Sequence, residues 1–168
     1  MNCYQVIALS TEMSGAMTIG QIGWQRGGSA GSSTGYYNNF KLYMGVAAGS
    51  ELTDTYEANY TPGTRTAVYA TSSQTMHAEA DGWMTITLDK PYVYDGIGNI
   101  ILELEWTGGS NMFYTYMWEI GANRGLMNKT SMGSPTGILS TKMSELMFET
   151  AYSLEASIFA AIKSLFYH

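Results

Sequence analysis

Apolar and polar residues alternate with a period of two along most of the first 150 positions. In the segment 38–46, Phe40, Leu42 and Met44 fall on one face of an extended chain, with polar positions such as Lys41 between them. Because successive side chains of a β-strand point to opposite faces of a sheet, this alternation is typical of a strand with one buried face. The sequence therefore predicts a strand here.

The same alternation occurs twice in the stretch 82–106, GWMTITLDKPYVYDGIGNIILELEW. It predicts strands at 83–88 and 99–106, separated by a Lys-Pro-aromatic corner and a glycine-rich turn with Asp-Gly and Gly-Asn pairs. In the second strand Glu103 and Glu105 share one face, which we expect to be exposed to solvent, opposite a buried face of leucines.

Other short apolar segments, bounded by turn residues, complete the pattern. They are residues 3–9, 16–25, 66–71, 112–119, 123–128 and 145–150. The Gly/Ser-rich stretch 26–35 and the polar stretch 49–63 are expected to be loops. About eight or nine short strands with turn signals between them predict an all-β antiparallel sandwich, jelly-roll-like or immunoglobulin-like, over residues 1–150.

Helical spacing replaces the period of two in the final segment, 151–168. Its apolar residues are Leu154, Ile158, Phe159, Ile162, Leu165 and Phe166. This spacing predicts a short C-terminal helix, although so short an apolar run is also compatible with an extra strand. An element this apolar needs a partner, either on the sandwich, on another copy of the chain or on a separate molecule. We therefore interpret it as an assembly segment.

Composition narrows the class of protein. The chain has 168 residues, only 13% of them charged, with 19 glycines, 13 tyrosines and a net charge of −6. The length fits one domain, and the uncharged polar palette is typical of extracellular all-β domains. An acidic chain with eight scattered basic residues disfavours nucleic acid as a partner. No apolar run approaches the roughly 20 residues of a membrane span. The single cysteine, Cys3, excludes an intrachain disulfide.

Residue types that bind metals are sparse. His77, Glu79 and Asp81 lie close together in the stretch SSQTMHAEADG, but a solvated loop histidine explains them better than a transition-metal site, which needs more nitrogen or sulfur donors. Asp95 and Asn99 could offer oxygen ligands to calcium, yet their Asp-Gly and Gly-Asn pairs are ordinary turn chemistry. No cofactor is expected.

Paired carboxylates raise the alternative of glycoside hydrolysis, which uses two of them. Glu103 and Glu105 lie two positions apart on one strand face, about 7 Å from each other by strand geometry. The simpler interpretation is that they keep an exposed sheet face soluble. A non-catalytic protein is therefore the favoured prediction.

Aromatic residues are the clearest surplus, because exposed tyrosine and tryptophan rings can stack on sugars or anchor a protein partner. The candidate contact residues are Tyr36, Tyr37, Tyr43, Tyr92, Tyr94, Tyr114, Tyr116 and Trp118. The competing interpretation places tyrosines at the edge of the core. Trp24, Trp83 and Trp106 are expected within the core itself.

One motif resembles a β-sandwich module that is repeated in large secreted bacterial surface proteins. A tryptophan-containing strand that ends in Leu-Asp-x-Pro-aromatic is followed by Tyr-x-Gly-x-x-Asn-Leu and an apolar strand. The matching residues are Trp83, Leu88, Asp89, Pro91, Tyr92, Tyr94, Gly96, Asn99 and Ile100. With flanking pieces at 19–28, 38–45 and 123–139, the resemblance covers residues 4–150. It implies an adhesive, structural or binding role at the cell surface.

These observations favour a non-catalytic extracellular β-sandwich with a structural or adhesive role, which self-associates or binds other surface proteins, as in a filament subunit. The first alternative is a carbohydrate-binding module that uses exposed tyrosine and tryptophan rings. The second is a glycoside hydrolase that uses Glu103 and Glu105.

Overall fold

The structure is a computed structural model that describes residues 2–28, 32–111, 113–127 and 133–151. Its regular elements are twelve strands and two 3₁₀ helices. The longer strands are β1 (Asn2–Ala8), β2 (Met17–Gln25), β3 (Thr34–Val46), β4 (Thr66–His77), β5 (Trp83–Tyr94), β6 (Ile100–Trp106) and β12 (Leu146–Thr150). The short ones are β7 (Gly108–Ser110), β8 (Met117–Glu119), β9 (Gly125–Met127), β10 (Ile138–Ser140) and β11 (Lys142–Ser144). The 3₁₀ helices are η1 (Ser10–Glu12) and η2 (Glu57–Asn59).

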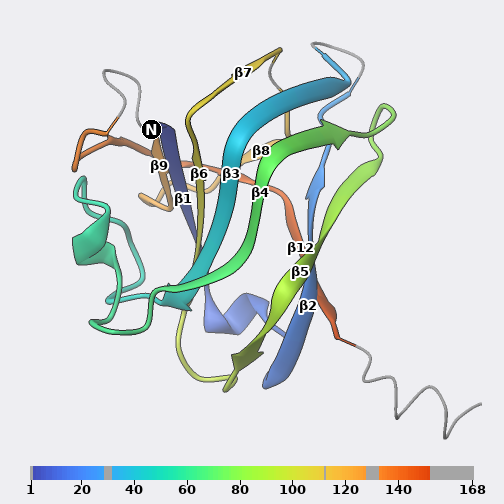
Figure 1. The fold of residues 1–168 in the computed structure, drawn as a ribbon. Helices are drawn as coiled ribbons and strands as arrows, with labels where there is room; N and C mark the ends of the chain where they lie inside the picture. Colours follow the sequence, from blue (N-terminus) through green and yellow to red (C-terminus); the bar gives the residue numbers. More distant parts are fainter. Residues whose placement is uncertain (1, 29–31, 112, 128–132, 152–168) are drawn as a thin grey trace, which may run out of the picture.

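The strands form two packed antiparallel sheets and a small ribbon (Figure 1). The larger sheet has the order β10-β9-β1-β6-β3-β4, and β7 adds to it by pairing with β3. The smaller sheet has the order β12-β2-β5, and β8 pairs with β11 in the ribbon. This arrangement confirms the predicted all-β antiparallel sandwich.

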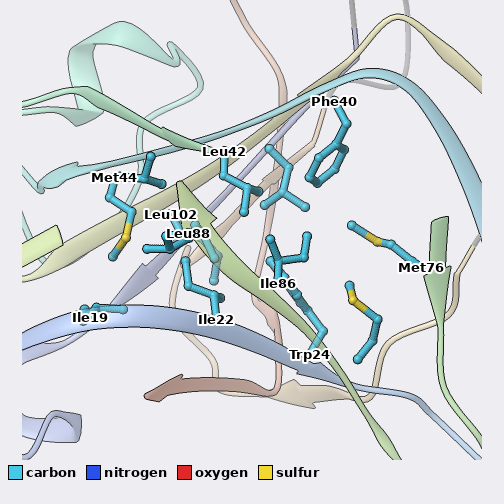
Figure 2. Close-up of a cluster of buried hydrophobic side chains, with 14 of the residues drawn as sticks. Ile19, Ile22, Trp24, Phe40, Leu42, Met44, Met76, Ile86, Leu88 and Leu102 are labelled. Carbon is cyan, nitrogen blue, oxygen red and sulfur yellow. The ribbon is translucent and has the colours of Figure 1, made fainter. Parts of the chain in front are cut away.

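The main core lies between the two sheets (Figure 2). Phe40, Leu42 and Met44 of β3 are fully buried there, as the alternation predicts. They face Ile22 and Trp24 of β2 across the interior. Truncating one of these side chains to alanine removes apolar burial and leaves a cavity, which in such cores costs about 2–5 kcal/mol.

A second apolar cluster covers the opposite face of the larger sheet. Ile7 of β1 and Ile101 of β6 pack there against Leu52, Tyr56 and Tyr60. These three residues belong to the connection 47–65, of which the stretch 49–63 was expected to be a polar loop. Both faces of the larger sheet are therefore buried at β1 and β6. Polar side chains on the second face of these strands lie beneath the connection 47–65.

Glu103 and Glu105 lie under this cover, so their predicted exposure is wrong. Their exposed fractions are 2% and 7%. The alternation itself holds, because Leu102 and Leu104 face the main core. A period of two identifies the two faces of a strand, but it does not reveal that a distant loop covers the polar one.

The predicted Lys-Pro-aromatic corner is also wrong, because β5 continues through Pro91 to Tyr94. The ladder between β2 and β5 changes register there, so Gly20 of β2 opposes the four residues 88–91 of β5. Proline, which lacks an N–H donor, is tolerated at such an irregularity. The glycine-rich turn after Tyr94 forms as predicted, between β5 and β6.

Other strand boundaries differ from the expectation. The stretch 72–77 belongs to β4 rather than to a loop, and Thr34 already begins β3. Within the described part of the expected strand, residues 113–119, only Met117–Glu119 forms a strand, while Phe113 and Thr115 make isolated bridges. Among the described residues no helix is long and apolar enough to span a membrane.

The last strand that the structure describes is β12, which ends at Thr150. The predicted helix or strand of the assembly segment, with Leu154, Ile158, Phe159, Ile162, Leu165 and Phe166, lies outside the described residues.

Candidate functional site

The chain segment 113–119 extends the layer formed by the smaller sheet. Thr115 forms an antiparallel bridge with Arg26, directly after β2. The Tyr116 N–H donates to the Gln25 carbonyl at 2.8 Å, and the Tyr116 carbonyl accepts from the Glu145 N–H at 3.0 Å. The segment therefore runs alongside the end of β2, next to the start of β12.

Side chains alternate along this segment as they do along a strand. Thr115 and Met117 line a cavity on the inner side. Tyr114, Tyr116 and Trp118 point to the outer side, with exposed fractions of 54%, 40% and 54%. Three large aromatic side chains thus stand on one outward face within five residues.

Trp118 is held in place although it is exposed. Its indole N–H donates to the Glu145 carboxylate at 2.8 Å. Its ring packs against Tyr116, with ring centroids 5.6 Å apart and planes tilted by 39°. A ring fixed by a hydrogen bond and by an aromatic neighbour loses little conformational freedom when a ligand stacks on it.

Trp83 lies on the same outer face, so the expectation that it belongs to the core is wrong. It pairs with Gln25 at the start of β5 and is 38% exposed. A Cβ built on Gly23 would lie 3.2 Å from the Trp83 ring, which shows that the indole covers this glycine of the neighbouring strand. Trp24 is buried as predicted, and Trp106 is half-buried against the core.

We define the aromatic surface as Trp83, Tyr114, Tyr116 and Trp118. Gln25 and Glu145 add hydrogen-bonding groups between these rings, because Gln25 pairs with Trp83 and Glu145 bonds Trp118. Flat apolar rings beside amide and carboxylate groups suit a ligand that is apolar on one face and rich in hydroxyls at its edges, such as a sugar.

The other tyrosines predicted as contacts are dispersed. Tyr36 is 45% exposed, but it lies on the outer face of the larger sheet, because its neighbour Tyr37 points into the core. Tyr37 and Tyr94 are buried, which removes them from any surface. Tyr92 is half-buried against the core. Trp83 was missed as a contact, and the signal for its position is Gly23, the glycine of β2 that its ring covers.

Tyr43 belongs instead to a buried polar cluster beneath the 47–65 connection. The Arg65 guanidinium stacks on the Tyr43 ring, with 3.6 Å between the guanidinium carbon and the ring centroid. It forms ion pairs with the Glu103 carboxylate and, at 3.0 Å, with the Glu105 carboxylate. The amide of Gln5 donates to the second Glu103 oxygen at 2.5 Å.

The cluster ties the connection 47–65 to the sheet. Gln5 also donates to the Tyr56 carbonyl at 3.0 Å and accepts from the Asn59 amide at 3.0 Å. Burial raises the pKa of Glu105, and the charge of Glu103 raises it further, although Arg65 opposes both effects. Burial likewise raises the pKa of the Cys3 thiol nearby. These contacts support a structural role, because both carboxylates bind the same guanidinium.

The residues considered as metal ligands make hydrogen bonds to other residues of the chain. The Asp95 carboxylate accepts from the Ile97 N–H at 2.9 Å, and Asn99 bridges the Ser10 N–H and the Gly49 carbonyl at 3.0 Å each. His77 ends β4 and contacts the Thr34 hydroxyl at 2.7 Å. No group of three or more His, Cys, Asp or Glu side chains with metal-binding geometry occurs in the described part of the chain.

Neither a protein-family model nor a curated protein sequence matches the chain.

Proposed function

We propose that the protein is a non-catalytic extracellular β-sandwich module with an adhesive role, and that its aromatic surface binds carbohydrate. The observation that carries the proposal is Trp118, an exposed ring held by a hydrogen bond to Glu145 and packed against Tyr116. Large apolar side chains that gather on one exposed face mark a ligand or partner site, and Trp118 belongs to such a group.

The chemistry of the surface favours a glycan over an apolar partner. Trp83, Tyr116 and Trp118 supply π-faces, while Gln25 and Glu145 lie between them with amide and carboxylate groups. The outer face of the smaller sheet continues with Thr85 and Thr87, both exposed. Such a mixture of rings and hydrogen-bonding groups matches the alternating C–H faces and hydroxyl edges of a polysaccharide.

A glycan array provides the test, with the intact protein and a Trp118→Ala variant applied to identical arrays. We expect retention on one class of polysaccharide and its loss in Trp118→Ala. Tyr36→Ala is the matched control, because it removes an exposed tyrosine from the opposite side of the sandwich. An intact protein that is retained on no glycan would refute the carbohydrate ligand.

Self-association is the second candidate, supported by the edge strand β10. Within the described part of the chain this strand pairs with β9 alone, and Ile138 and Leu139 on it are 46% and 36% exposed. An apolar edge strand readily pairs with another chain. In this role the module is a subunit of a surface layer or filament, and the assembly segment 151–168 is its proposed contact element. Replacing Ile138 by Lys should then lower the mass in solution, measured by light scattering.

A further inference from the structure

A small cavity opens at one end of the main core, on the inner side of the segment that carries the aromatic surface. Its volume is about 140 Å³. Strands of both sheets and of the ribbon contribute to its wall. Met117 lines it while remaining 37% exposed, so the cavity meets solvent beside this side chain. Nothing in the proposed adhesive function uses this space.

The wall is mainly aromatic and sulfur-containing. Trp24, Tyr37, Phe40 and Phe113 are among the residues that line the cavity, together with three methionines. An engineered apolar cavity of about 150 Å³ takes up benzene, so this volume fits one six-membered ring rather than a drug-sized molecule. The size of the cavity thus sets the size of the ligand.

One patch of the wall is polar and consists of three hydroxyl groups. The Ser144 hydroxyl lies 3.2 Å from the Tyr4 hydroxyl and 3.0 Å from the Thr115 hydroxyl, and all three side chains line the cavity. Ser144 is 3% exposed. The three hydroxyl groups therefore form a short chain of hydrogen bonds, in which each group can act as donor or acceptor. The oxygens also retain lone pairs for a donor.

An apolar cavity with one polar patch is how proteins orient small ligands, because the apolar wall supplies affinity and the polar group fixes direction. A ligand hydroxyl group can join the chain of hydrogen bonds between Tyr4, Ser144 and Thr115, which an apolar ligand cannot do. We propose that this cavity binds one small aromatic alcohol of the phenol class, with its ring against the aromatic wall and its hydroxyl group on Ser144. The site goes beyond the proposed adhesive function and does not rest on it.

The methionine methyl groups provide the test, because Met76, Met117 and Met127 line the cavity. The protein is labelled with ¹³C at its methionine methyl groups and titrated with phenol, followed by NMR. We expect saturable shifts of these three signals. Met147, which packs over Gly23 on the outer face, is the internal reference and should stay unchanged.

Benzene and a Ser144→Ala variant separate the two parts of the proposal. Benzene should bind to the wild type more weakly than phenol does. Ser144→Ala should lower the affinity for phenol by about 3- to 10-fold, the effect of one hydrogen bond, and leave the affinity for benzene unchanged. If Ser144→Ala does not fold, Tyr4→Phe removes the neighbouring hydroxyl instead. Absent or unsaturable shifts, which would mean a cavity that holds only water, would overturn the proposal. Equal affinities for phenol and benzene would overturn the role of the hydroxyl groups.

Discussion

The indole N–H of Trp118 donates to the Glu145 carboxylate at 2.8 Å, although 54% of the Trp118 surface faces solvent. Glu145 directly precedes β12. Its N–H also donates to the carbonyl of Tyr116, so one residue fixes both aromatic neighbours. The aromatic surface is therefore organised by the sandwich itself before any ligand arrives.

Replacing Glu145 by Ala should weaken glycan binding without unfolding the protein. Ordering one long side chain on binding costs about 0.5–1.5 kcal/mol, which corresponds to a loss of about 2- to 10-fold in affinity. The change in the free energy of unfolding should stay within about 0.5 kcal/mol, because the residue is not buried. Affinity electrophoresis and urea denaturation measure the two quantities. Glu145→Gln keeps an oxygen acceptor and should bind like the wild type; if Glu145→Ala does so too, the anchoring role is wrong.

Arg65 should be important for stability, because it compensates two buried carboxylates. Breaking a buried ion pair from one side costs about 3–5 kcal/mol, and the partial exposure of Arg65 places Arg65→Ala near the lower end of that range, at about 3 kcal/mol. Lys41→Ala is the matched control, because it removes an exposed cation at the position of β3 opposite Glu105 in the strand register. Urea denaturation should show that this control loses less than about 0.5 kcal/mol of the free energy of unfolding. Equal costs for both variants would contradict the compensating role.

The raised pKa of Glu105 predicts a dependence of stability on pH. The folded protein holds this proton to a higher pH than the unfolded chain does, whose pKa is the ordinary 4.5. The free energy of unfolding contributed by Glu105 therefore falls as pH rises from about 4.5 to the raised pKa, and then stays constant. Glu105→Gln does not titrate, so its stability relative to the wild type should increase across this window. Urea denaturation at a series of pH values measures it.

Glu12 provides a control of opposite sign. Its hydrogen bonds with the Arg124 guanidinium lower the pKa of Glu12 below the ordinary 4.5. The stabilisation it contributes is present above pH 4.5 and is lost as pH falls through the lowered pKa. Glu12→Gln should therefore be less stable than the wild type at neutral pH, with a difference that shrinks in acid. A pH-independent difference for either glutamate would contradict the assigned shift.

The assembly segment can be removed as a test of self-association. Without residues 153–168 the sandwich should keep its thermal unfolding midpoint, because β12 ends before the deletion. Any oligomer should become a monomer, because its proposed contact element is missing. Light scattering coupled to size-exclusion chromatography measures the mass of both proteins. An oligomer that persists after the deletion would rule out this element as the contact.

Much of the fold could be predicted from local pattern, because a strand such as β3, which borders the main core, shows it directly. Phe40, Leu42 and Met44 alternate with exposed residues and are buried as expected. The burial of the second face of the larger sheet could not be predicted, because the residues that cover it come from the connection 47–65. The polar pattern of Gln5, Glu103 and Glu105 is the same whether water or Arg65 compensates the charges.

The candidate site was only partly predictable. Tyr114, Tyr116 and Trp118 could be identified because an alternating aromatic run places its rings on one face. Trp83 could not, because a tryptophan at a strand start has the same local pattern in a core as on a surface. Its position depends on Gly23 in another strand, which leaves room for the indole. Pro91 predicts a corner by local rules, but the register change opposite Gly20 accommodates it within β5.

Calorimetric titration of a polysaccharide that the protein retains tests the central claim most directly, with the wild type, Trp118→Ala and Tyr36→Ala compared. Truncation of a central aromatic contact costs about 2 kcal/mol or more, so Trp118→Ala should bind about 30-fold more weakly. Tyr36→Ala should match the wild type, because Tyr36 lies on the other sheet. Equal affinities for all three proteins would contradict a carbohydrate site at the aromatic surface.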